Sequence, residues 1–252
     1  MSPVGRQKPI HVLQLYPRDM NIYGDYGNAL VLKQRLQWYG YQPIIHTYDP
    51  GEEFPEQVDL LIGGGGQDSG QERIHQDLLQ IRPQLRDLAA AGTPMLVVCG
   101  LYQLFGHSFD PVDGPRLSGL GLLDVTTVGT ENRLIGNTVV QSSQFGEIIG
   151  YENHSGQTYL GADTQPLGRV ITGEGNNERD DHEGARHQNI LGSYLHGALL
   201  PKNPAIADFL IGTAVQRAHG EQLGELQAPV TAPLTLAQLT ERARATAASR
   251  PR

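Results

Sequence analysis

Short apolar segments alternate with amphipathic ones between residues 10 and 106, and this alternation restricts the fold more than any other feature of the sequence. Strands are predicted at residues 10–15, 43–48, 58–62 and 95–98, and helices at residues 24–39 and 71–91. Glycine supplies 31 of the 252 residues, which favours many tight connections between such elements. Alternating strands and helices with short loops are typical of a parallel sheet that is covered on both faces.

The pattern changes after residue 106. Residues 120–173 contain short Val/Thr/Ile-rich runs broken by glycine, which predicts a β-rich section, and residues 173–184 are polar and predict a loop. A strand at residues 190–195 and helices at 204–219 and 234–248 complete the prediction. We therefore expect a three-layer α/β fold in which a mostly parallel central sheet carries a β-rich extension. One domain would span residues 1–220, and residues 221–252 would form a C-terminal extension, partly helical or flexible.

Charge and hydropathy exclude several classes of function. The 19 Lys and Arg residues are outnumbered by 27 Asp and Glu residues, so the net charge is −8, and a basic face for nucleic acid is not expected. No run approaches the ~18 apolar residues of a membrane span, and the first residues lack the apolar middle of a signal peptide. We expect no membrane insertion and a cytoplasmic protein.

The sequence contains a single cysteine, Cys99, at the end of the apolar run that begins at Met95. One thiol rules out an internal disulfide and a zinc site built from several thiolates within the chain. A strand that turns into a helix at Gly100 would expose the sulfur at the carboxyl edge of the sheet, where the helix N-terminus stabilises a thiolate. We predict that Cys99 is a nucleophile, with a buried packing residue as the alternative.

A thiol nucleophile needs a base, and His196 is the best placed of the nine histidines. It follows the predicted strand at residues 190–195, so it is expected at the same edge of the sheet as Cys99. There it would hold the sulfur as a thiolate and later protonate the leaving group. The alternative is a hydrogen-bonded histidine that only ends a strand.

Four consecutive glycines occupy positions 63–66, where a predicted strand ends. Because glycine has no Cβ, backbone amides in such a turn can approach a developing negative charge. We predict that the amides of Gly65 and Gly100 bind an oxyanion. A phosphate cradle is the alternative, but the Lys-Ser/Thr pair of a P-loop and the glycine spacing of a dinucleotide site are both missing.

Six short motifs occur in a fixed order along the chain. They are NIYGDYGN (residues 21–28), GGGGQD (63–68), CGLYQLFG (99–106), YENHSG (151–156), GEGNN (173–177) and GSYLHG (192–197). With these motifs the chain resembles the class I (triad) glutamine amidotransferases. It is most similar to their cobyric-acid-synthase-like branch, and within that branch to the small glutaminase subunits (GatD type) of lipid II isoglutaminyl synthases.

The resemblance implies that Cys99 hydrolyses L-glutamine to glutamate and ammonia through a thioester, with His196 as the base. It also implies that Gln103 contacts the substrate and that Arg133 binds it. A guanidinium suits the second role, because it can clamp an α-carboxylate with paired hydrogen bonds. From the residues alone, helix surface is the alternative for Gln103, and a surface salt bridge in a turn between strands is the favoured interpretation of Arg133.

The resemblance further implies a heterodimer with a Mur-ligase-like, ATP-dependent partner. On that partner, ATP and Mg²⁺ would activate the D-glutamate carboxyl of the lipid II stem peptide, and ammonia would convert it to D-isoglutamine. No cofactor and no metal are expected on this chain. The acidic residues at 180–183 invite interpretation as metal ligands, but a solvated loop is the better expectation.

His196 departs from the commonest pattern of the wider family, in which a glutamate stands two residues after the histidine. Here Gly197 and Ala198 follow it. Resemblance to the isoglutaminyl subunits suggests that a carboxylate of the partner orients the imidazole, and Asp208 is the candidate within the chain.

Three other functions stay open from the sequence. The first is a glutaminase subunit for another acceptor such as a corrinoid carboxylate. The second is a cysteine-dependent hydrolase or redox enzyme, and the third is a non-catalytic interaction subunit. The second is less favoured, because it gives no role to Gln103 and Arg133.

Overall fold

The computed structural model describes residues 8–229 and 233–250, and its centre is a six-stranded sheet with the order β11-β12-β4-β3-β1-β2. The strands are β1 (Pro9–Leu15), β2 (Gln42–Tyr48), β3 (Leu60–Gly63), β4 (Met95–Val98), β11 (Ala185–His187) and β12 (Ile190–Ser193). All neighbours in this sheet are parallel except β11, which pairs antiparallel with β12 at one edge. The predicted mostly parallel central sheet is confirmed.

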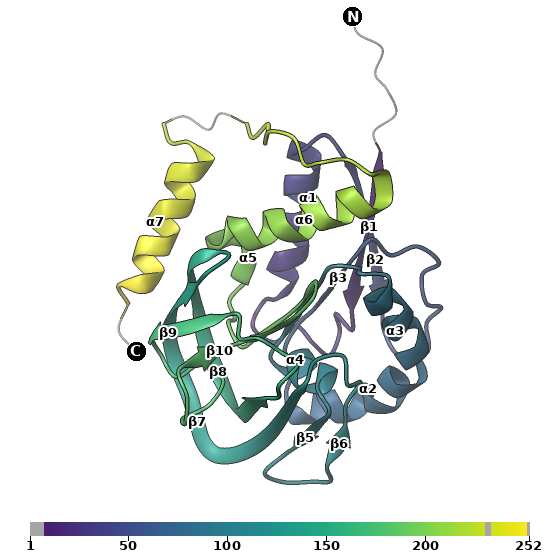
Figure 1. Cartoon of the computed structure of the whole chain (residues 1–252), viewed down its shortest axis with the longest axis vertical. Coiled ribbons are helices and arrows are strands. Elements are labelled where there is room, and N and C mark those ends of the chain that lie inside the picture. Colours follow the sequence, from purple (N-terminus) through teal and green to yellow (C-terminus); the bar gives the residue numbers. More distant parts are fainter. Residues whose placement is uncertain (1–7, 230–232, 251–252) are drawn as a thin grey trace, which may run out of the picture.

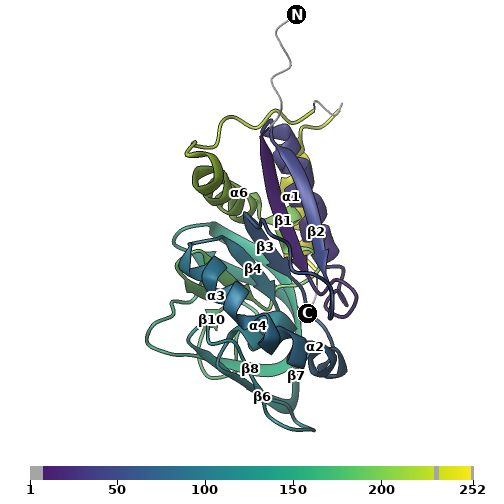
Figure 2. The same cartoon turned by 90° about the vertical axis from the view of Figure 1, so that its right-hand side faces the viewer.

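Helices cover both faces of this sheet, as Figures 1 and 2 show. One side carries α1 (Tyr26–Trp38), α5 (Leu199–Lys202) and α6 (Pro204–His219), and the other carries α2 (Asp68–Gln80), α3 (Arg82–Ala90) and α4 (Gly100–Phe105). Every residue of β3, β4 and β12 is buried. Continuous burial is expected of strands that lie between two helical layers, so the three-layer prediction is also confirmed.

The single helix predicted at residues 71–91 is wrong in one respect, because the structure divides it into α2 and α3 at Ile81. Pro83 stands in the first turn of α3. A proline lacks the N–H that would continue the hydrogen-bond ladder of α2, and its ring disfavours helical geometry in the residue before it.

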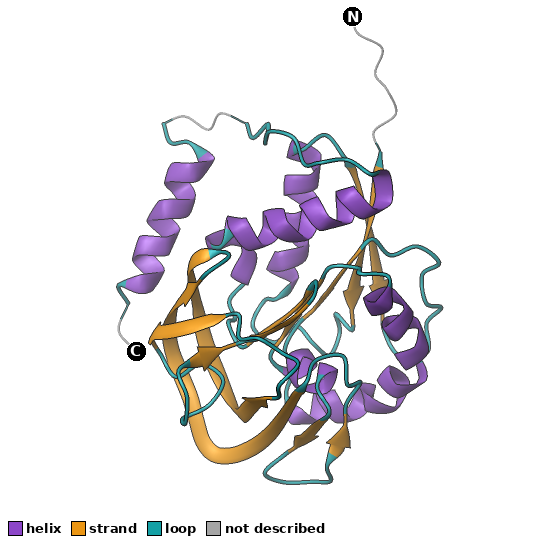
Figure 3. Cartoon of the chain, in the orientation of Figure 1, coloured by secondary structure: helices purple, strands orange, loops and turns teal. Residues whose placement is uncertain are grey.

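The β-rich section forms a second sheet of its own and does not add strands to the central one. Its order is β10-β9-β7-β5-β6, and β8 pairs with β7. The strands are β5 (Ser108–Asp110), β6 (Leu117–Ser118), β7 (Val125–Ser142), β8 (Gly146–Leu160), β9 (Gly168–Thr172) and β10 (His182–Glu183). The long antiparallel β7–β8 hairpin dominates this sheet (Figure 3). β10 lies within residues 173–184, where the sequence predicted only a loop.

The C-terminal part contains the helix α7 (Leu236–Ala248), in agreement with the helix predicted at residues 234–248. A capping box between Thr235 and Gln238 begins it, because each residue satisfies a backbone N–H of the other. No residue of α7 is buried, and Arg244 attaches it to the body through the carbonyl oxygens of Lys202 and Glu147. The division into a domain at residues 1–220 and an extension at residues 221–252 stays a prediction. Within the described ranges, we find no helix with the length and apolar character required to traverse a lipid bilayer.

Candidate active site

Three neighbouring strands of the central sheet end at one edge, and Cys99, the glycine run and His196 lie there. Cys99 comes directly after β4, which pairs with β3 on one side and β12 on the other. The glycine run follows β3, and His196 follows β12. Parallel alignment places these three strand ends side by side, so Cys99 and His196 meet although 97 positions separate them in the sequence.

Cys99 has an unusual backbone conformation, with φ 49° and ψ −107°. Its N–H donates to the carbonyl oxygen of Ser193 at 2.8 Å, and α4 begins at the next residue. Left-handed φ values are costly for a residue with a Cβ and persist where the surroundings enforce them. The strand–turn–helix geometry is that of a nucleophile elbow, which presents the side chain at the edge of the sheet.

His196 is completely buried, and its Nδ1 lies 3.7 Å from Oδ1 of Asp25. The ring of Tyr23 packs on it at a centroid distance of 4.4 Å. Burial of the ring opposes its protonation, but attraction to Cys99 and to Asp25 outweighs burial and raises the pKa of His196 to about 10. An imidazole that holds its proton firmly suits a site where a thiolate must be stabilised.

Gly65 lies between the thiol and the imidazole. A Cβ at this position would stand 2.7 Å from Cε1 of His196, 2.9 Å from Cβ of Cys99 and 3.4 Å from its Sγ. Cys99 and His196 therefore flank a space that exists only because residue 65 has no side chain.

The predicted oxyanion role of the Gly65 amide needs correction. Its N–H donates to Oδ2 of Asp25 at 2.8 Å, so it is already paired with a carboxylate. The N–H groups of Gly66 and Gly100 have no such partner among the described residues, and the Gly66 nitrogen would lie 3.2 Å from a Cβ on Gly100. These two amides are the better pair of oxyanion donors, so the predicted role of Gly100 stands as a proposal.

Gln103 is buried and does not lie on a helix surface. Its side-chain oxygen accepts a hydrogen bond from Nε2 of Gln71 at 2.8 Å, and its Nε2 donates to the hydroxyl of Tyr194 at 3.1 Å. A Cβ at Gly156 would lie 2.3 Å from that Nε2. Gly156 of the YENHSG motif therefore leaves room for the side-chain amide of Gln103. The hydrogen bonds with Gln71 and Tyr194 fix the orientation of that amide.

A cavity of about 340 Å³ opens beside Cys99, and both Gln103 and Arg133 line it. Arg133 lies where the pairing of β7 with β8 shifts register, between Gly129 and Leu134. Such irregularities re-aim side chains, and here the guanidinium donates to Oδ1 of Asn153 at 2.6 Å and to the Tyr23 hydroxyl at 3.2 Å. A surface salt bridge, the alternative from the sequence, does not describe this arrangement.

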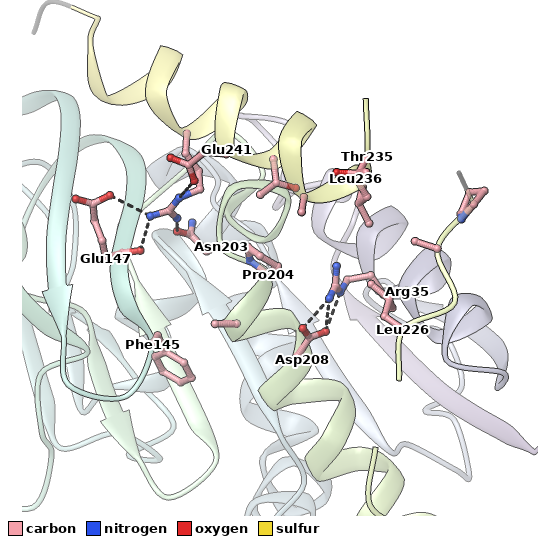
Figure 4. Close-up of a pocket in the computed structure, with 16 residues that line it drawn as sticks. Arg35, Phe145, Glu147, Asn203, Pro204, Asp208, Leu226, Thr235, Leu236 and Glu241 are labelled. Carbon is pink, nitrogen blue, oxygen red and sulfur yellow. Dashed lines mark hydrogen bonds and ion pairs between the residues drawn. The ribbon is translucent and has the colours of Figure 1, made fainter. Parts of the chain in front are cut away.

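Asp208 does not face His196, so the sequence-based candidate for the orienting carboxylate is wrong. Its two carboxylate oxygens accept hydrogen bonds from the guanidinium of Arg35 at 2.6 Å (Figure 4). The pair lines a different cavity, of about 680 Å³, between α6 and α7. Cys99, Gln103, Arg133 and His196 do not line that cavity.

The acidic residues at 180–183 have separate partners. Asp181 binds Arg169, Asp180 accepts a hydrogen bond from Asn177, and Glu183 is buried. Within the described ranges, no group of three or more His, Cys, Asp or Glu side chains is arranged to hold a metal ion.

The sequence analysis missed Tyr23 and Asp25, which lie in the NIYGDYGN motif after β1. Other residues of this motif contact the segment that follows His196. Asn28 accepts a hydrogen bond from the N–H of Leu200 at 3.0 Å, and a Cβ at Gly27 would lie 2.6 Å from Cβ of Ala198. The only signal was the motif itself, because its proximity to His196 depends on how β1 and β12 are placed in the sheet.

Glu183 supports the segment before His196 and makes stability depend on pH. Its Oε1 accepts hydrogen bonds from the Tyr194 N–H and the Ser193 hydroxyl. Burial raises the pKa of Glu183 to about 7 from an ordinary 4.5, the charge of Glu152 adds to the rise, and the two hydrogen bonds oppose it. Folding therefore favours the protonated carboxyl. The contribution of Glu183 to the free energy of unfolding is largest below pH 4.5, falls as the pH rises to about 7, and is constant above that pH.

Glu183→Gln should remove this dependence, since the neutral amide keeps an acceptor for Tyr194 and Ser193. As the pH rises from the ordinary pKa of Glu183 to its raised pKa, the natural protein should lose up to about 3 kcal/mol in the free energy of unfolding relative to the variant. Denaturant unfolding of both proteins at a series of pH values measures this difference. Parallel stability curves would contradict the account of Glu183.

Comparisons with known proteins agree with this geometry. The GatD subunit of the lipid II isoglutaminyl synthase (glutamine-hydrolyzing) of Staphylococcus aureus is 38% identical over 82% of this chain and 86% of its own length. The subunit of the same name from Streptococcus pneumoniae is 35% identical over 85% of this chain and 84% of its own. A glutamine amidotransferase structure from Thermotoga maritima matches with a TM-score of 0.53 at 15% identity, covering 94% of this chain and 93% of that one, and supports the fold.

A family profile adds the remaining evidence, because residues 11–204 match the CobB/CobQ-like glutamine amidotransferase domain. This range includes Cys99, Gln103, Arg133 and His196, and it ends where α6 begins. The chain belongs to the CobB/CobQ-like glutamine amidotransferase family.

Proposed function

We propose that this chain is the glutaminase subunit of a lipid II isoglutaminyl synthase. It hydrolyses L-glutamine through a thioester on Cys99 and delivers the ammonia to an ATP-dependent, Mur-ligase-like partner. The observation that carries the proposal is the meeting of Cys99 and His196 across Gly65, beside a cavity lined by Gln103 and Arg133. Two relatives of similar length bear the name of such a subunit.

In the proposed reaction, the Cys99 thiolate attacks the side-chain amide carbon of glutamine. The resulting oxyanion accepts hydrogen bonds from the amides of Gly66 and Gly100, and His196 gives its proton to the departing ammonia. His196 then takes a proton from water as it attacks the thioester, which releases glutamate and restores the thiolate.

The charges around the cavity fit a free amino acid. Arg133 and Asp68 both line it, so one guanidinium and one carboxylate are available for the α-carboxylate and α-ammonium groups of glutamine. His154 also lines the cavity, but burial lowers its pKa to about 3, so it adds no charge. Gln103 is the neutral group for the side-chain amide.

The acceptor chemistry belongs to the partner in this proposal. ATP and Mg²⁺ would bind to the partner and activate the D-glutamate carboxyl of the lipid II stem peptide. This chain would need no cofactor of its own. Ammonia would then form the D-isoglutamine amide, with both subunits at work in the cytoplasm.

Transfer of labelled nitrogen tests the proposal. The complex with the co-purifying partner is given ATP, Mg²⁺, lipid II and glutamine labelled with ¹⁵N in the side-chain amide. We expect the label in the D-isoglutamine of lipid II by mass spectrometry, with matching release of glutamate. In the matched control, the partner without this chain receives an ammonium salt in place of glutamine. It should still amidate lipid II, because ammonia no longer has to be released from glutamine.

Two outcomes would overturn the assignment. Glutamate release with a corrinoid carboxylate as the amidated product would assign the chain to another acceptor. Absence of glutamate release from the active complex would leave this chain a non-catalytic subunit.

A further inference from the structure

Tyr23 lies between two of the predicted site residues. Its hydroxyl oxygen accepts a hydrogen bond from Nη2 of Arg133 at 3.2 Å. Its ring packs on the imidazole of His196, with 4.4 Å between the ring centroids. Tyr23 and Arg133 both line the cavity that opens beside Cys99. The hydroxyl of Tyr23 thus lies beside the guanidinium that is proposed to bind the α-carboxylate of glutamine.

Both side chains keep hydrogen-bond donors free. A tyrosine hydroxyl can accept one hydrogen bond and donate another. Among the described residues, the Tyr23 oxygen accepts from Arg133, but its O–H has no acceptor. Arg133 donates from Nε to Asn153 and from Nη2 to Tyr23, and its other N–H groups have no acceptor in the same part of the chain. An anion bound by the guanidinium would therefore come within reach of the Tyr23 O–H.

The charge of Arg133 decides which group of glutamine Tyr23 contacts. The guanidinium would repel the α-ammonium group, and it already occupies a lone pair of the Tyr23 oxygen. The same guanidinium attracts the α-carboxylate, whose oxygens are acceptors for an O–H. A hydrogen bond from a hydroxyl to a carboxylate is charge-assisted and about twice as strong as a neutral one. The Tyr23 hydroxyl is thus suited to the carboxylate, and Asp68, which also lines the cavity, is suited to the ammonium group.

Tyr23 is held in place before a ligand binds. The N–H of Ile22 donates to the carbonyl oxygen of Gly65 at 3.0 Å, and the N–H of Gly65 donates to Oδ2 of Asp25 at 2.8 Å. These two bonds attach the chain on either side of Tyr23 to the glycine run, and packing on His196 restricts the ring. A side chain that is already ordered loses little conformational entropy on binding. The hydroxyl is therefore preorganised for a ligand in the cavity.

We propose that Tyr23 is a substrate-binding residue whose hydroxyl donates a hydrogen bond to the α-carboxylate of glutamine. Arg133 and Tyr23 then bind this carboxylate together, the first through its charge and the second through a directed O–H. A compound without an α-carboxylate gains nothing from the hydroxyl, so Tyr23 contributes to the selection of a free amino acid. This inference rests on the proposed glutaminase function.

Tyr23→Phe removes the hydroxyl and keeps the ring on His196. In the complex with the partner, KM for L-glutamine should rise by about tenfold or more, because a hydrogen bond to a charged group is lost, while kcat stays within about twofold. The rate at which iodoacetamide alkylates Cys99 in the absence of glutamine should not change, since the contacts of the thiol and the imidazole are kept. An unchanged alkylation rate shows that the rise in KM does not come from a damaged site.

An analogue of glutamine identifies the group that Tyr23 contacts. γ-Aminobutyramide is glutamine without the α-carboxylate, and it keeps the amino group and the side-chain amide. Its protection of Cys99 against alkylation and the ammonia released from it should both be weaker than with glutamine. Both should also be the same for the natural complex and for Tyr23→Phe.

Tyr26→Phe is the matched control, because Tyr26 lies in the same motif, is 46% exposed and does not line the cavity. It should leave KM, kcat and the alkylation rate unchanged. A natural KM in Tyr23→Phe would overturn the inference. An equal loss of affinity for glutamine and for γ-aminobutyramide would also overturn it, and would assign Tyr23 a packing role only. Failure of the proposed function is distinct, since the natural complex would then release no glutamate at all.

Discussion

Replacing Cys99 with alanine is expected to abolish glutamate release and to leave the fold intact. The variant loses the sulfur that would form the proposed thioester, so the rate should fall by about 10⁴-fold or more. The cost in stability should be small, because alanine keeps the Cβ that the left-handed backbone already accommodates at this position. Assays of glutamate release by the complex, with thermal unfolding of the isolated chain, check both expectations.

Cys99→Ser provides the matched variant. A hydroxyl is a far weaker nucleophile than a thiolate and is not ionised by the same imidazole, so this variant should also be inactive. Hydrolysis of glutamine by either variant at the natural rate would exclude Cys99 as the nucleophile.

Adding one methyl group at Gly65 is expected to have the second largest effect. The new Cβ of Gly65→Ala would stand 2.7 Å from the His196 ring and 2.9 Å from Cβ of Cys99, closer than carbon atoms pack. One of these two side chains must move, and in an active site a displacement near 1 Å costs about 100-fold in rate. We expect kcat/KM to fall at least that far, with a loss of about 1–3 kcal/mol in the free energy of unfolding.

Gly212→Ala is the control for this prediction. Gly212 lies inside α6, and a Cβ there would meet nothing closer than Leu223 at 3.8 Å. Alanine favours a helix interior, so this variant should be as active as the natural protein and equally stable or slightly more so. Natural kcat/KM in Gly65→Ala would mean that Cys99 and His196 do not act across this space.

The sequence predicted the elements that local pattern determines. The apolar run from Met95 ends at Cys99, Gly100 begins a helix, and the structure agrees at each of these positions. The helix α6 also has the predicted bounds, because Asn203, Pro204 and Gly220 mark its ends. Residues that follow parallel strands could be placed at one edge from the order of elements alone.

Features that depend on distant contacts were beyond the sequence. Asp25 lies beside His196 only because the chain after β1 packs against the segment after β12. Asp208 binds Arg35, 173 positions away in the sequence, and does not contact His196. The β-rich section formed a separate sheet because β7 and β8 pair mainly with each other. The division between α2 and α3 differs from these, since Pro83 stood in the sequence as a visible signal.

Trapping with an electrophilic analogue of glutamine tests the central claim most directly, because Cys99 is the only cysteine of the chain. A diazoketone or chloroketone in place of the side-chain amide would occupy the substrate cavity and alkylate the nucleophile. We predict one adduct per chain by intact mass, located on Cys99 by peptide mapping, prevented by excess L-glutamine and greatly slowed in His196→Ala. Modification of another residue, or modification of Cys99 that L-glutamine does not prevent, would contradict the account.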